Sequence, residues 1–190
     1  MNGKAILKAA VLVAALAVTG AQAAEVSKVR IDDSAPVGDA DLVLNGAGMR
    51  TKGFMEIYIG ALYAPAKTTS PASLLDSTAP RRLWLRMMRD IGSKTMTDAL
   101  GDGYNANNSE ADRAATKAAF DQFADILKKV GELKKTDQLA IDFAADGVSV
   151  SHNGKPAGKV ASPQFAKALL KVWIGDKPVD SDLKKSLLGN

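Results

Sequence analysis

The chain has 190 residues, a formal net charge of +4, no cysteine and one histidine. Without cysteine it can form no disulfide and perform no thiolate chemistry, and with one histidine it is poorly supplied with zinc or copper ligands. We therefore expect no metal site and no cofactor. Lys4 and Lys8 carry two of the four net positive charges, and the near-neutral remainder argues against a nucleic-acid partner.

The first residues have the features of a secretory signal peptide. Lys4 and Lys8 precede an apolar run at residues 9–18, which is too short to span a bilayer. The tripeptide AQA that ends at Ala23 is a small-x-small cleavage site and predicts a cut after Ala23. We therefore expect a periplasmic or secreted product with one domain at residues 24–190 and no membrane span.

The N-terminal half of this domain is predicted to be mainly β-structure. Alternating apolar residues, glycines and prolines predict, in chain order, an arm or edge strand within residues 25–39, a strand at 41–45 ended by a glycine turn at 46–48, a long strand at 53–64, a loop at 67–79 with a helical turn at 73–76, and a strand at 81–89.

The strand at residues 53–64 has two different faces, because strand side chains alternate. One face is almost wholly apolar and is expected to belong to a core: Met55, Ile57, Ile59, Ala61 and Tyr63. The other is mixed and is expected to face water or a cavity: Phe54, Glu56, Tyr58, Gly60 and Leu62. Arg50 stands just before this strand.

The C-terminal half mixes helices with hairpins. Caps, apolar stripes and turn pairs predict a helix at 93–104 capped by Ser93, a helix at 109–130 opened by Ser109, strands at 137–144, 148–152 and 155–160 joined by Asp146-Gly147 and Asn153-Gly154, a helix at 162–173 opened by Ser162 and Pro163, and a helix at 181–188. This order predicts an α+β domain, with an antiparallel sheet of about six or seven strands and helices on one face.

Four local patterns in this order resemble the chalcone isomerase family, in its bacterial, exported, chalcone isomerase-like branch. They are GAGMR followed by F-x-x-x-Y-x-x-x-L-Y, then IGSKTMTDAL, DGVSVSHNGKPAGKV and SPQFAKALLKVWIGDKPVDSDLKKSLLG. The resemblance covers roughly residues 42–189 and implies the open-faced sandwich of that family.

The resemblance also implies a ligand role for Arg50 and Tyr58. Arg50 matches the cleft arginine that follows GAG in plant chalcone isomerases, and Tyr58 falls on their threonine position. Three further polar positions of those enzymes fall near Ile91, Asp98 and Ala166, where the polar groups are missing or changed. Fatty-acid-binding members of the family hold a carboxylate with an arginine and a tyrosine, and Arg50 with Tyr58 looks more like that pair.

The chemistry of the side chains agrees with this preference. A guanidinium is a planar fork that suits a carboxylate, and a phenol beside it adds a donor. Apolar walls would shelter a hydrophobic tail if the even-numbered faces of the strands at 53–64 and 81–89 line one cleft: Phe54, Leu62, Trp84 and Met88. An ion pair of Glu56 with Arg50 or Arg86 is the competing structural interpretation.

We therefore expect an exported, non-catalytic protein that binds a small hydrophobic anion, such as a fatty acid, between sheet and helices. Two alternatives stay open. The first is an intramolecular lyase of the chalcone isomerase type acting on an unknown substrate. The second is a structural or partner-binding domain whose cleft is filled by side chains. The sequence predicts no oligomeric state.

Overall fold

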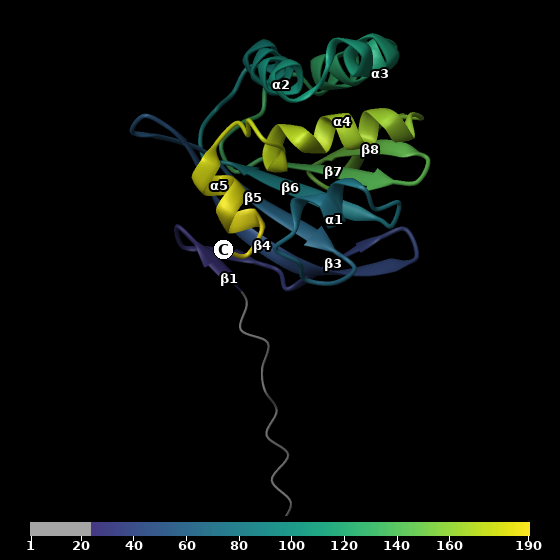
Figure 1. Ribbon diagram of the computed structural model, residues 1–190. Coiled ribbons are helices and arrows are strands. Elements are labelled where there is room, and N and C mark those ends of the chain that lie inside the picture. Colours follow the sequence, from purple (N-terminus) through teal and green to yellow (C-terminus); the bar gives the residue numbers. More distant parts are fainter. Residues whose placement is uncertain (1–23) are drawn as a thin grey trace, which may run out of the picture.

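The computed structural model describes residues 24–190, so the predicted signal peptide lies outside the described residues. Seven strands form one antiparallel sheet in the order β3-β4-β5-β6-β7-β8-β9, and β1 and β2 form a separate hairpin. Helices cover one face of the sheet (Figure 1). α4 and α5 lie on the strands, α3 packs on β9 and on α4, and α2 packs on α3 and α4. The predicted fold class is confirmed.

The strands and helices occur along the chain in the predicted order. The strands are β1 (Ala24–Val26), β2 (Val29–Ile31), β3 (Ser34–Val37), β4 (Ala40–Lys52), β5 (Met55–Ala64), β6 (Arg81–Met87), β7 (Gln138–Ala144), β8 (Gly147–His152) and β9 (Lys155–Val160). The helices are α1 (Pro71–Leu75), α2 (Ser93–Asn107), α3 (Glu110–Val130), α4 (Pro163–Ile174) and α5 (Ser181–Leu187). Among the helices of residues 24–190, none is both long enough and apolar enough to cross a membrane.

The predicted glycine turn at residues 46–48 is wrong, because these residues lie inside β4. Gly48 pairs with Gly60 of β5 in the antiparallel ladder. The glycines are needed for packing: a Cβ built on Gly46 would lie 2.0 Å from the carbonyl oxygen of Ser186 in α5. Asn45 reinforces this contact by donating its side-chain amide to the carbonyl of Leu187 at 2.7 Å. Residues 45–48 of β4 therefore form the surface on which the C-terminal helix α5 packs.

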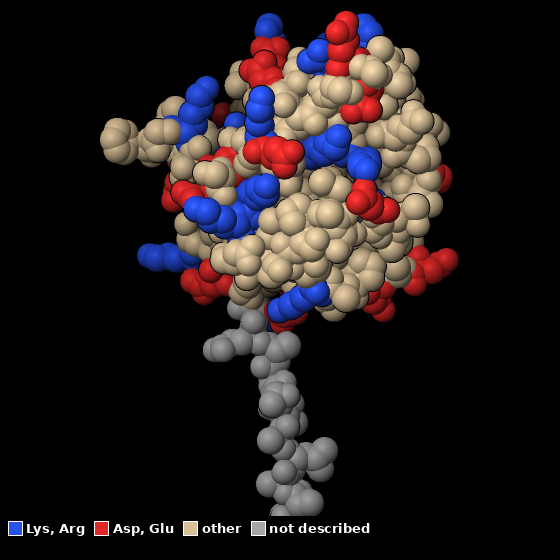
Figure 2. All heavy atoms as spheres, viewed as in Figure 1, with Lys and Arg blue, Asp and Glu red and all other residues tan. Residues whose placement is uncertain are grey.

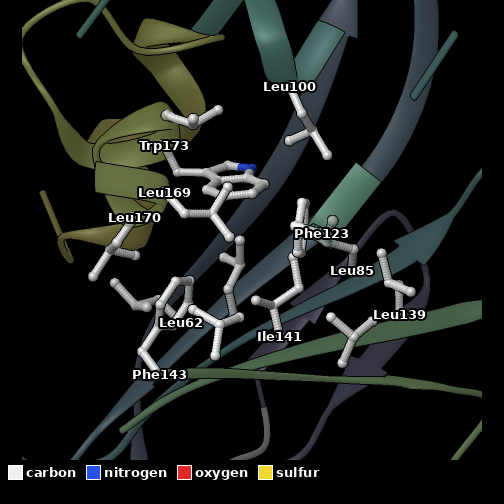
Figure 3. Packing of buried hydrophobic residues seen from close by; sticks show 14 of the residues in the cluster. Leu62, Leu85, Leu100, Phe123, Leu139, Ile141, Phe143, Leu169, Leu170 and Trp173 are labelled. Atoms are coloured by element: carbon white, nitrogen blue, oxygen red, sulfur yellow. The ribbon is translucent and has the colours of Figure 1, made fainter. Parts of the chain in front are cut away.

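Both faces of β5 are buried along most of its length, which differs from the prediction of one core face and one cavity face. Tyr58 and Leu62 belong to the main core. Figure 3 shows Leu62 in this core together with Trp173 of α4. On the opposite face, Ile59 and Tyr63 enter a second, smaller core. The N-terminal strands β1, β2 and β3 supply the other side of that core. They have only three or four residues each, too few for an apolar alternation to predict it.

The helix ends were predicted with mixed success. Ser109 and Ser162 cap α3 and α4 as predicted, accepting hydrogen bonds from the amides of Asp112 at 3.1 Å and Phe165 at 3.2 Å. In α2, however, Ser93 is already helical, and the N-cap residue is Gly92, which has no side chain to cap the first turn. The first amides of α2 are therefore left without a side-chain acceptor.

Tyr63 in the second core makes the fold sensitive to alkaline pH. Its hydroxyl donates to the carbonyl of Asp32 at 3.0 Å, and burial, followed by the negative charge of Asp32, raises the pKa of Tyr63 to about 12. An unfolded tyrosine loses its proton near pH 10. Between pH 10 and about 12 the unfolded chain is thus ionised while the folded protein is not, so the stability that Tyr63 contributes below pH 10 is lost as pH rises.

We expect the Tyr63→Phe variant to be about 1 kcal/mol less stable than the wild type at pH 8, because it loses one hydrogen bond. This difference should shrink between pH 10 and pH 12, because phenylalanine has no proton to release. Urea denaturation of both proteins at pH 8, 10 and 11.5 measures it. Two stability curves that stay parallel over this range would show that Tyr63 is not responsible.

Candidate ligand-binding site

A cavity of 320 Å³ opens at one end of the sheet, where the β4–β5 hairpin approaches the connection from β6 to α2 and the first turns of α2. It combines basic groups with apolar walls, and its lining consists of Arg50, Lys52, Met55, Ile57, Arg89, Asp90, Ile91, Gly92, Thr95, Met96 and Ala99. This composition is typical of sites for small amphiphilic molecules.

Arg50 is held at the inner side of this cavity by the strand register. β4 and β5 place it directly opposite Tyr58, and its guanidinium carbon lies 5.3 Å from the centre of the Tyr58 ring. Its Nε is buried and has no hydrogen-bond partner among residues 24–190. A buried donor without an acceptor costs about 1–3 kcal/mol. A ligand acceptor would offset that cost only after a shift of the side chain, because this atom is closed off from the cavity.

Tyr58 lies beneath the guanidinium rather than beside a ligand. It is 2% exposed, and its hydroxyl accepts a hydrogen bond from Nε1 of Trp173 at 2.9 Å. Burial raises the pKa of Tyr58, although the positive charge of Arg50 and the hydrogen bonds to Trp173 and to Arg50 act in the opposite direction. The two predicted residues therefore converge, but Tyr58 supports Arg50 as an aromatic floor and keeps its proton.

The cavity has a net positive lining. Arg50, Lys52 and Arg89 line it, and none of the three forms an ion pair with a residue that the structure describes. Asp90 is the single carboxylate of the lining, and it already accepts hydrogen bonds from the Lys135 amide at 2.8 Å and from Nζ of Lys134 at 3.3 Å. The uncapped N-terminus of α2 adds a partial positive charge.

The competing ion pair of Glu56 is not formed. Within the described chain, Glu56 contacts neither Arg50 nor Arg86; its carboxylate accepts a weak hydrogen bond from Ser27 at 3.5 Å. Arg50 therefore remains available to an anion.

The predicted apolar walls do not surround Arg50. Phe54 is fully exposed at the tip of the β4–β5 hairpin, and Leu62 is part of the main core. Trp84 and Met88 pack on the opposite face of the sheet, against the second core. The assumption that even-numbered residues of both strands share a face was wrong. Tyr58 pairs with Met87, and directly paired residues of antiparallel strands point the same way.

Trp84 instead lines a second cavity, of 520 Å³, on the outer face of the sheet. Its indole Nε1 donates to Oε1 of Gln138 at 3.2 Å, and the neighbouring Arg82 is bound to Asp142 through contacts of 2.6 Å and 2.8 Å. Arg30 and Arg86 also line this space. It is separated from Arg50 by the sheet, so the two cavities can be tested independently.

The apolar wall that does face Arg50 comes from residues that the sequence analysis did not assign to a wall of the site. Ile91, Met96 and Ala99 belong to the start of α2 and the connection before it. The segment IGSKTMTDAL was recognised as a pattern, and Ile91 was noted as an altered polar position. Nothing in its sequence showed that it closes over the β4–β5 hairpin.

A curled antiparallel sheet with helices on one face, and a cavity where a long hairpin meets the first large helix, defines an open-faced α+β sandwich. The sequence model described as chalcone isomerase-like matches residues 23–189, and the chain therefore belongs to the chalcone isomerase-like family.

Among solved structures, a fatty-acid-binding protein from Arabidopsis thaliana is similar to this chain, with a TM-score of 0.68 and 15% sequence identity. The similarity covers 85% of this chain and 92% of the plant protein. At this identity the match establishes the shared fold. Comparison with curated protein sequences gave no significant match.

Proposed function

We propose that the protein is an exported, non-catalytic carrier of a small hydrophobic acid. The carboxylate is held by Arg50, and the tail lies against Ile57, Ile91 and Met96 in the 320 Å³ cavity. The fatty-acid-binding activity named for the plant protein of the same fold agrees with this ligand class.

The observation that carries the proposal is that Arg50 lines the cavity without an ion-pair partner, and with its Nε unpartnered, among the described residues. Its Nε is buried without a partner among the described residues, yet the group stands at the wall of an accessible cavity and is fixed by the Tyr58 ring. A bidentate carboxylate would satisfy the fork, and Arg89 and the α2 N-terminus would add attraction for negative charge. The 320 Å³ cavity thus offers both a head-group site and an apolar wall.

The size of the cavity favours a short ligand. At 320 Å³ it is at the lower end of the range of about 300–1,000 Å³ for small-molecule sites. Tyr58, Trp173 and Leu100 fill the space further inside, so the cavity does not continue as a tunnel between sheet and helices. We therefore propose a medium-chain or single-ring acid whose tail stays near the surface.

An isomerase would require more polar groups than this cavity offers. Of the positions that correspond to polar residues in plant chalcone isomerases, Ile91 is apolar, Ala166 is buried in the main core, and Asp98 is on the surface paired with Lys94. Thr95 is the one hydroxyl side chain in the described lining. The lyase alternative thus has less support than simple binding.

Native mass spectrometry of protein isolated without detergent tests the proposal. We expect the wild type to carry a co-purifying organic acid, and Arg50→Met to carry none, because methionine keeps the length of the side chain but removes the fork. The same spectrum tests export, since a chain that begins at Ala24 is expected. The residues before Ala24 would then be absent from the mature protein.

Arg86→Gln is the matched control, because Arg86 lines the cavity on the other face of the sheet. This variant should retain the acid. An acid that survives in Arg50→Met and disappears in Arg86→Gln would move the binding site to the outer cavity and overturn the proposal. Turnover of a chalcone by ligand-free protein would favour the lyase alternative.

A further inference from the structure

The tip of the β4–β5 hairpin is the most exposed apolar feature of the described chain. Phe54 has a relative exposure of 108% and its neighbour Met55 one of 46%, and the third exposed large apolar residue, Val43, is near the other end of β4. The hairpin projects beyond the body of the protein (Figure 1). At the same place a knob of uncharged atoms extends from the surface, with basic side chains behind it (Figure 2).

The backbone does not require an aromatic residue at this position. Lys52 pairs with Met55, so the turn has two central residues, and Gly53 takes the positive φ of 62° that a type II′ turn needs at its first position. Position 54 follows with no such restriction. Phe54 contacts neither of the two hydrophobic cores, so its phenyl ring contributes no burial to the stability of the fold.

Basic groups lie directly behind the tip. Lys52 is in the hairpin itself, and Arg50 and Arg89 line the cavity whose rim includes Met55. Asp90, the one carboxylate of that lining, is engaged with Lys134 and Lys135. A surface that approached the tip would thus meet an apolar point first and a positively charged zone immediately behind it.

We propose that the β4–β5 tip, defined as Lys52 to Met55, docks the protein on an anionic lipid bilayer. Phe54 and Met55 enter the interface, and Lys52 and Arg89 contact the phosphate groups of the lipids. The inference rests on the proposed function, because the bilayer is then the source or destination of the acid. Docking would place the bilayer at the rim of the cavity, so that the acid passes between them without crossing bulk water.

A bilayer fits the tip better than a protein partner does. A stable protein interface buries about 800 Å² on each partner, and two adjacent apolar side chains on a narrow turn offer much less. Interfacial binding to lipid needs only a small apolar insertion together with basic residues that attract anionic head groups. The arrangement of one aromatic residue ahead of several cations matches that requirement.

Vesicle co-sedimentation tests the docking. The wild type should bind vesicles of phosphatidylcholine with phosphatidylglycerol, and bind weakly to phosphatidylcholine alone. Phe54→Ser should reduce the partition coefficient about tenfold, because one large apolar side chain is no longer buried in the lipid interface. Lys52→Gln should reduce it about fivefold on the anionic vesicles, the effect of one basic residue near the surface. Both residues are exposed, so neither change should impair folding.

Lys155→Gln is the matched control, since Lys155 is an exposed lysine next to the turn of another hairpin, β8–β9. It should bind vesicles as the wild type does. Intact mass shows whether residues 1–23 are present in each protein. Variants with the same N-terminus are compared, so a difference in vesicle binding reports on the tip. Phe54→Trp should keep binding, and brominated acyl chains should quench its added fluorescence.

The docking and the proposed function can fail separately. Affinity for decanoate in vesicle-free buffer tests the carrier function, and Phe54→Ser should leave it unchanged, because Phe54 does not line the cavity. Transfer of a fluorescent acid from anionic vesicles should be slower with Phe54→Ser. Equal vesicle binding by the wild type and Phe54→Ser, or no vesicle binding by the wild type, would overturn the docking, even if the tip were found to contact a protein.

Discussion

The Gly46→Ala variant is expected to lose about 3 kcal/mol of unfolding free energy, at the upper end of the usual effect of overpacking. The new methyl group would lie 2.0 Å from the carbonyl oxygen of Ser186 and 2.9 Å from that of Leu187. These are backbone atoms of the helix that closes the domain, so no side-chain rotation can relieve the contact. A urea denaturation curve with a lower midpoint and an unchanged slope would show the loss.

Two comparisons make this result specific. Gly101→Ala should be neutral or stabilise by up to about 1 kcal/mol, because Gly101 is inside α2 and its added methyl meets only Phe120 at 3.5 Å. Gly48→Ala should be rescued by Ser186→Gly, since its clash is with the side chain of Ser186 at 2.5 Å, whereas Gly46→Ala should not be. A Gly46→Ala protein as stable as the wild type would mean that α5 does not pack on β4 as described.

The second large effect is expected on ligand affinity. Arg50→Lys should weaken binding of decanoate about tenfold and Arg50→Met about a hundredfold, because a lysine keeps the charge but cannot form two parallel hydrogen bonds. Isothermal titration of the acid-free proteins measures both values. Equal affinity of the wild type and Arg50→Lys would show that the geometry of the guanidinium has no role in binding.

Arg50→Met should leave the free energy of unfolding unchanged or raise it slightly, which separates Arg50 from a structural arginine. Removing the buried, unpartnered Nε is favourable by about 1–3 kcal/mol, and losing the contact with the Tyr58 ring is unfavourable by about 0.5–1 kcal/mol, so no loss of stability is expected. Arg81→Met is the matched contrast. Arg81 is buried and its Nε is likewise unpartnered among the described residues, but another guanidinium nitrogen donates to the carbonyls of Leu74 and Ser77, so its loss should destabilise by about 1–3 kcal/mol.

Local patterns predicted the elements well where the signal was short-range. Asn153-Gly154 has positive φ values of 49° and 76° and forms the predicted hairpin turn, and Ser162 with Pro163 opens α4 as predicted. Such features depend on backbone preferences and hydrogen bonds within a few residues. They do not depend on contacts with distant segments. The order of the predicted strands and helices along the chain was therefore sufficient to indicate an α+β fold.

The candidate site was predicted only in part, because it depends on which strands are neighbours. The pairing of Arg50 with Tyr58 follows from the register of β4 on β5, which a supposed turn at residues 46–48 had hidden. Trp84 was assigned to the wrong face because antiparallel register decides which residues of two strands share a side, and a shift by one residue reverses every assignment.

The amino-acid sequence by itself determined most of the strands, the hairpin turns at Asp146-Gly147 and Asn153-Gly154, the caps of α3 and α4, and the family resemblance, all of which are recorded in short stretches of chain. The tertiary structure alone decided that α5 rests on Gly46, that the start of α2 closes the cavity beside Arg50, and that Phe54 projects away from it. The physical reason is that side-chain alternation gives each strand two faces but does not determine which segment of the chain covers each face. What packs against each face is set by segments far away in the chain.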